Sequence, residues 1–277
     1  MRTRDVGRRE SDTGGGRRSG IGWYGWWQLR DYLIDRGTPT VIVSALFGYL
    51  TAAPMLASFK NQIDQLPPRL ITKWGGVDGA RAMLLRELTE RFLLTFLGTV
   101  VFLAALFAMN GIVANDRKLG FYRFLFAKPV SPARYYGQAF LIHCVGFVVL
   151  AALLALVYGA IVFPIIGTHL MVVMAMMFLC YAGIAFCLSA AARWDWLSLV
   201  AVTVAASHFW GTYGESSNLF AKLLYLLPPL HRTAELYAAV AKGTEIPWPL
   251  LYWLAGYGVV SYLIGLIVLY YRRLAIA

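Results

Sequence analysis

Residues 115–134 carry most of the charge in the middle of the chain, and their side chains suit binding better than bond chemistry. Four aromatic rings lie within the six positions 121–126. Aromatic rings favour the headgroup zone of a membrane, and long basic side chains reach from there to phosphate groups. The stretch therefore predicts a short helix lying on a membrane face. Its charged residues are Asp116 and the basic residues Arg117, Lys118, Arg123, Lys128 and Arg134.

The end of this stretch predicts a break followed by a new helix. Pro129 interrupts a helix because it lacks a backbone N–H group. Ser131 then suits the N-cap position, and Pro132 suits the first helical position. We expect the stretch to lead directly from Ser131 into a membrane-spanning helix.

No catalytic motif accompanies this binding stretch. The sequence contains no GxxxxGK(S/T) phosphate loop, no HExxH, no GxSxG and no Cys/His cluster at metal-ligand spacing. We therefore expect the chain not to be an enzyme by itself and to hold neither a metal nor another cofactor. The apolar segments lack carboxylates, which argues against a carrier driven by protons or sodium. For His143 and His208, both in apolar segments, we expect a hydrogen-bonded packing role.

The composition places the chain in a membrane. Of its 277 residues, 59% are hydrophobic, and the mean hydropathy is +0.61. A soluble globular chain is nearer half apolar. The net charge is +11, but the basic residues flank apolar segments. Anionic lipid and membrane topology therefore explain the charge better than nucleic acid, which we do not expect as a partner.

The first 36 residues predict a tail and a surface helix. Residues 1–20 are rich in Arg, Gly and Ser without apolar periodicity, which is typical of a disordered tail. Residues 21–36 are amphipathic, with Trp23, Trp26 and Trp27 on the apolar side. Tryptophan is enriched where membrane meets water, so we expect this helix to lie at the interface.

We expect residues 21–277 to form one all-α membrane domain with six spans. The third span is long, and its Ala151, Ala155 and Gly159 form a stripe of small residues suited to close helix packing. A helix starting near Asp78, a candidate N-cap, continues into the second span. The apolar run within residues 218–241 is too short to cross a membrane, so we expect a re-entrant or interfacial segment there. The expected spans are at about residues 38–59, 92–114, 133–164, 169–191, 196–210 and 250–269.

The distribution of basic residues predicts the orientation. With six spans, the side that holds both termini and the central loop has 16 Lys and Arg residues, against 9 on the other side. Acidic residues divide equally, so the net charges are +9 and +2. The positive-inside rule therefore places both termini in the cytoplasm. Arg272 and Arg273 follow two tyrosines at the end of the last span, which is typical of a cytoplasmic interface anchor.

The central stretch resembles the cytoplasmic loop of ABC-2-type transporter permeases. The shared pattern is an acidic residue, Arg, two variable residues and Gly, then about six mostly apolar residues, then a small residue, a variable residue and Pro-Val-Ser. Residues 116–120 read DRKLG and residues 127–131 read AKPVS. The chain departs from the family in having Asp116 where Glu is usual and Phe-Tyr-Arg at 121–123 where Thr-Leu-Glu is usual.

This resemblance implies a membrane subunit of an ATP-driven exporter. The stretch would be a coupling helix that docks on a separate ATPase subunit, which binds ATP and Mg. Two permease chains, identical or related, would assemble with two ATPases in lipid, for a bacterial chain in the inner membrane. Apolar side chains would supply buried contact and basic ones electrostatic complementarity. The implied coupling residues are Asp116, Arg117, Lys118, Gly120, Phe121, Arg123, Phe124, Leu125 and Pro129.

Other readings of the same sequence stay open at this point. The stretch can be an interfacial anchor with no partner. The chain can be a membrane scaffold on the same fold that does not transport, or a secondary carrier or channel that needs no ATPase.

Overall fold

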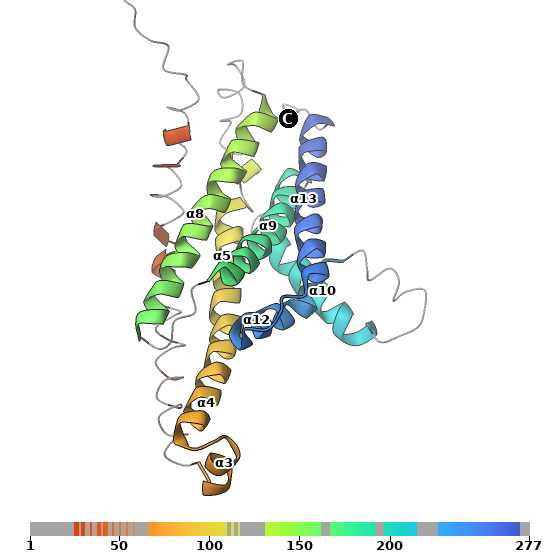
Figure 1. The fold of residues 1–277 in the computed structure, drawn as a ribbon. Coiled ribbons are helices and arrows are strands. Elements are labelled where there is room, and N and C mark those ends of the chain that lie inside the picture. Colours follow the sequence, from red (N-terminus) through yellow and green to blue (C-terminus); the bar gives the residue numbers. More distant parts are fainter. Residues whose placement is uncertain are drawn as a thin grey trace, which may run out of the picture.

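The computed structural model of the chain describes residues 66–109, 131–161, 167–191, 197–214 and 227–271, with scattered positions between 25 and 58 and at 112, 113 and 116. Every regular element in these ranges is a helix, which confirms the predicted all-α class (Figure 1). The predicted tail at 1–20 lies outside the described residues, as do most of the predicted surface helix and first span.

Four helices in the described ranges are long and apolar enough to cross a membrane, which indicates a membrane protein. They correspond to the second, third, fourth and sixth predicted spans. The long third span is confirmed as a helix of 30 residues. The four are the composite helix Val77–Met109, made of α4 (Val77–Phe92), η2 (Leu93–Leu97) and α5 (Gly98–Met109), then α8 (Pro132–Ile161), α9 (Thr168–Ala191) and α13 (Trp248–Tyr271).

Helix α10 (Leu197–Tyr213) lies where the fifth span is predicted, but it has 17 residues. A helix crossing the hydrocarbon core needs about 20 residues. It is therefore not among the four long helices, and six spans stay a prediction.

The core of the described bundle is built on α9. Within the most apolar 18-residue stretch of α9, 67% is buried inside the chain. The same share is 33% for α8 and 22% for α13. Helices α9 and α13 run parallel, since Gly258 faces Cys180 and Gly183 while Gly265 faces Phe186 and Cys187 further along both helices. A Cβ atom added to Gly258 would lie 2.8 Å from the Cα of Cys180. Glycine thus allows the two backbones to touch, as in other membrane helix pairs.

The second span continues from a polar helix, as predicted, through the π-helical turn η2. The predicted N-cap is wrong: Gly76 occupies that position, with φ at 103°, and Asp78 lies in the first helical turn. The sequence also shows no sign of α3 (Pro68–Lys73), which lies inside the predicted loop. At the junction of α4 and η2, Phe92 stacks on Tyr158 of α8 with 3.9 Å between ring centroids.

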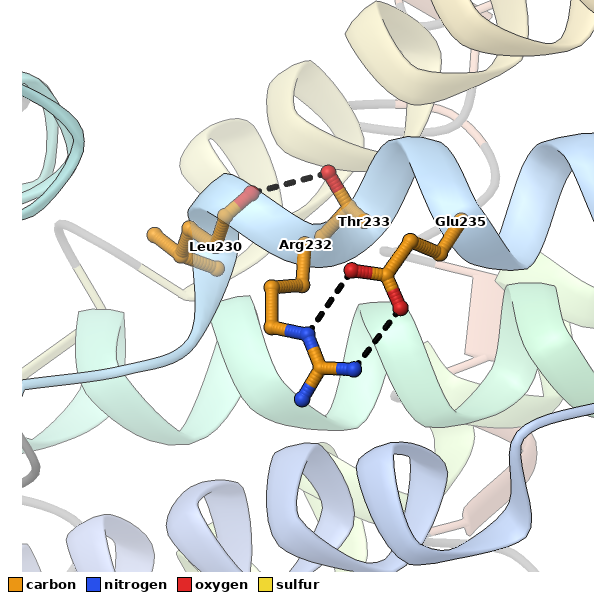
Figure 2. Close-up of polar contacts among 4 residues, drawn as sticks. All are labelled: Leu230, Arg232, Thr233 and Glu235. Carbon is orange, nitrogen blue, oxygen red and sulfur yellow. Dashed lines mark hydrogen bonds and ion pairs between the residues drawn. The ribbon is translucent and has the colours of Figure 1, made fainter. Parts of the chain in front are cut away.

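Helix α12 (Thr233–Lys242) packs beside the polar helix α4. It follows the short 3-10 helix η3 (Leu230–Arg232) and confirms a helix in the second part of the predicted interfacial segment. Its Lys242 pairs with Glu90 of α4 at 3.2 Å. Figure 2 shows how it begins: both carboxylate oxygens of Glu235 accept hydrogen bonds of 2.8 Å from the Arg232 guanidinium. The ion pair to α4 places α12 beside a charged helix.

The ring of His231 in η3 stacks on the indole of Trp210 in α10, with 4.1 Å between ring centroids. Burial lowers the pKa of His231, and the charge of Arg232 lowers it further, while Glu235 acts in the opposite direction. The folded chain therefore favours the neutral ring. The contribution of the neutral His231 ring to folding stability is full above the ordinary pKa of about 6.5. It falls as the pH drops below that value.

We expect His231 to titrate below its ordinary pKa of about 6.5 in the folded chain. The effect on total stability is small because His231 is exposed apart from the stacking of its ring on Trp210. Carbon-13 NMR of histidine-labelled protein, assigned with a His231→Gln variant, measures this pKa. A titration above the ordinary value would contradict the stacked, partly desolvated geometry.

Candidate functional site: the frame of the central loop

The structure describes one of the nine predicted coupling residues, Asp116. Among the predicted interface residues, Trp26 and Trp27 are exposed, at 60% and 50%, which is compatible with contact to lipid headgroups. Trp23, Arg272 and Arg273 lie outside the described residues. So do the other coupling residues, which are Arg117, Lys118, Gly120, Phe121, Arg123, Phe124, Leu125 and Pro129.

Asp116 is bonded to the start of helix α8. The hydroxyl of Tyr136 donates a hydrogen bond of 3.0 Å to the Oδ2 atom of Asp116. Tyr136 is buried, with 1% of its surface exposed, and Asp116 is half-buried. A hydrogen bond to an ionised acceptor is stronger than one between neutral groups. The first residue of the predicted coupling pattern is therefore held against the helix that follows the loop.

The chain just before the loop is tied to α9. The backbone N–H of Val113 donates to the Oγ atom of Ser189 at 3.1 Å, and both residues are fully buried. Ser189 lies two residues before Ala191, the last residue of α9. The entry to the loop thus rests on the end of the most buried helix.

The exit from the loop is the predicted N-terminus of α8. The helix begins at Pro132, and the backbone N–H of Arg134 donates to the Oγ atom of Ser131 at 3.3 Å. This confirms Ser131 as a capping residue and Pro132 as the first helical residue. The cap satisfies a donor that a helix start otherwise leaves without an intrahelical partner.

The bonded residues Val113, Asp116 and Ser131 form the frame of the central loop. Next to this frame, a cluster of four aromatic residues, here called the aromatic cluster, links α8, α9 and α13. Tyr136 contacts Phe186 with 5.8 Å between ring centroids, and Phe186 contacts Tyr262 at 4.7 Å. Phe140 contacts Tyr262 at 4.4 Å. The first two separations lie within the usual range of aromatic pairs, about 4.5–7 Å, and the third is just below it. In Figure 1 the start of α8 and the end of α13 lie at the same end of the bundle, where the cluster joins them.

The described contacts of this region hold a segment in place. Asp116 accepts a hydrogen bond from a buried hydroxyl, Ser131 caps a helix, and the cluster is apolar apart from the two tyrosine hydroxyls. In the described part of the chain, no group of three or more His, Cys, Asp or Glu could hold a metal ion. The described contacts therefore connect Asp116, at the start of the loop, with α8, α9 and α13.

His143 and His208, the two histidines of the apolar segments, differ in how deeply they are buried. His143 is 5% exposed, and its Nδ1 atom bonds the carbonyl of Ala139 one turn earlier, so the predicted packing role is confirmed. His208 is exposed on α10 among the described residues, with its ring 6.1 Å from that of Phe209, so a packing role stays a prediction for this residue.

The sequence did not predict the residues that the frame bonds to or the members of the aromatic cluster. Tyr136, Phe186, Ser189 and Tyr262 lie in apolar segments, where they read as ordinary interface or packing residues. A signal was present for one of them, since Tyr135 and Tyr136 lie three and four residues after Pro132, the predicted first helical residue. No protein-family model, curated protein or solved structure matches the chain.

Proposed function

We propose that the chain is the membrane subunit of an ATP-driven exporter of the ABC-2 permease type. The observation that carries the proposal is the pattern of the central loop, from Asp116 through the Pro-Val-Ser at 129–131, between two long apolar helices. Support comes from the frame of this loop. Its entry is bonded to α9 at Ser189, its first patterned residue to Tyr136, and its exit is a capped helix start.

In this proposal, the work comes from a separate ATPase subunit that binds ATP and Mg. Closure of two such subunits pushes on the coupling helix between the second and third spans. Phe121, Phe124 and Leu125 form buried contacts, whereas Arg117, Lys118 and Arg123 provide charge complementarity. Pro129 and the capped start of α8 pass the displacement to the third span.

The proposed assembly contains a second permease chain, identical or related, with the cargo pathway between the two. Each permease has six spans, α10 being part of the fifth, and both termini lie in the cytoplasm. Helix α12 and the polar part of α4, which are joined by the ion pair of Lys242 with Glu90, then belong to the opposite membrane face. The surrounding solvent is lipid, with Trp23, Trp26, Trp27, Arg272 and Arg273 at the interface. For a bacterial chain the location is the inner membrane.

The test is purification of the tagged full chain from its native membrane in mild detergent, followed by photolabelling with azido-ATP and Mg. We expect a second polypeptide to co-purify in a fixed ratio, to carry the label, and to hydrolyse ATP. Excess unlabelled ATP should prevent labelling, which controls for nonspecific reaction. A chain that purifies folded without any ATP-labelled subunit, from membranes that contain it at native level, contradicts the proposal.

A further inference from the structure

We propose that Tyr136 is the positioning residue that holds the loop against the bundle and passes its movement through Phe186 to the paired helices α9 and α13. The holding contact stands on the structure alone. Its role in transport rests on the proposed function. Two kinds of contact carry the inference: the hydrogen bond from Tyr136 to Asp116 and the ring contacts of the aromatic cluster.

The bond between Tyr136 and Asp116 fixes the start of the loop. The carboxylate of Asp116 accepts a hydrogen bond from the hydroxyl of Tyr136, a residue that is 1% exposed. Because a buried hydroxyl that loses its partner keeps its desolvation penalty, separating the two groups is costly. The loop start and the first turns of α8 are thus expected to move together.

The ring of Phe186 connects this unit to α13. Phe186 is fully buried on α9 and lies against Gly265, where an added Cβ atom would be 2.7 Å from its Cδ1 atom. The ring therefore occupies the space left by the missing side chain. A close-packed ring in such a position has little room to absorb a displacement of Tyr136. Movement of α8 is therefore passed on to α13 at Gly265 and Tyr262.

Tyr262 provides a matched control for the hydroxyl of Tyr136. It belongs to the same cluster, and its hydroxyl is buried with no hydrogen-bond partner among the described residues. A Tyr262→Phe variant removes an oxygen atom from the cluster without removing a described bond. A Tyr136→Phe variant removes an oxygen atom together with the bond to Asp116.

The first experiment measures the position of the loop without any partner. Limited trypsin digestion of the purified full chain reports cleavage after Arg117 and Lys118 by mass spectrometry. We expect Tyr136→Phe to raise the cleavage rate about tenfold, the factor for losing a hydrogen bond to a charged group, and Tyr262→Phe to leave it unchanged. Asp116→Ala should raise it equally, with no further rise in the double variant. Equal rates in wild type and Tyr136→Phe overturn the holding role.

The second experiment measures transmission in the complex with the ATP-labelled subunit. Cys187, half-buried beside Gly265, is kept as the one remaining thiol by Cys144→Ala and Cys180→Ala. We expect ATP with vanadate to change the rate at which N-ethylmaleimide labels Cys187, and expect Phe186→Leu and Tyr136→Phe to remove this change while the ATPase stays bound. A change that persists in both variants overturns the relay. Absence of any ATP-labelled subunit contradicts the proposed function instead, and the trypsin result still decides the role of Tyr136.

Discussion

Replacing Gly258 by alanine should lower the free energy of unfolding by about 1–3 kcal/mol or more, the usual cost of overfilling a close-packed site. The added Cβ would meet backbone atoms of Leu179 and lie 2.8 Å from the Cα of Cys180. Backbone atoms cannot rotate away as a side chain can, so α9 and α13 must separate. Because α9 is the most buried helix of the bundle, their separation loosens its core. Thermal unfolding in detergent, followed by circular dichroism, measures the loss.

Gly256→Ala is the control for this variant. It lies on the same helix two residues earlier, is exposed, and has nothing within 4 Å of the added Cβ. Alanine favours a helix over glycine by about 1 kcal/mol, so this variant should be neutral or slightly stabilised. Gly183→Ala should resemble Gly258→Ala, since its Cβ would meet the backbone of Gly258. The two losses should not add, because either one already separates the helices. Equal unfolding temperatures for Gly256→Ala and Gly258→Ala would contradict the close contact.

The course of single helices could be predicted from the sequence because local signals mark it. Ser131 and Pro132 predict the start of α8, and the length of its apolar run predicts that it spans the membrane. The pairing of α9 with α13 could not be predicted. Both helices are apolar around their whole circumference, so no polar face shows which side meets a neighbour. The predicted small-residue stripe illustrates this: Ala151 and Ala155 are buried, but Tyr158 makes the contact expected near Gly159.

The site shows a similar division. Its place in the chain, between two long helices, could be predicted, and so could the capped exit. The partner of Asp116 could not, because Tyr136 lies 20 residues further on and the two meet only through the fold. The family resemblance places Asp116 in the coupling stretch, and the structure adds a contact of its carboxylate with the chain itself. An acidic residue in such a pattern can therefore hold the loop in place while neighbouring residues reach a partner.

Replacing Phe124 and Leu125 by aspartate should abolish co-purification of the ATPase subunit. Under the proposed function these side chains are buried at the docking surface, and losing one central apolar contact costs about 2 kcal/mol. Two such losses, together with two buried charges lacking partners, amount to about a thousandfold weaker binding or more. The amount of azido-ATP-labelled subunit per tagged chain measures the effect. The aromatic cluster is untouched, so thermal unfolding of the purified chain should be unchanged.

The matched control is Leu274→Asp with Ile276→Asp, which adds the same two charges after the last span, on the side predicted to face the cytoplasm. It should retain the labelled subunit in full, because no contact to the partner is proposed there. Retention in both double variants would place the docking surface elsewhere and leave the loop as an interfacial anchor. Loss in both would point to repulsion of the partner by added negative charge. Loss in the loop variant alone is expected, because only there do the new charges replace apolar contacts.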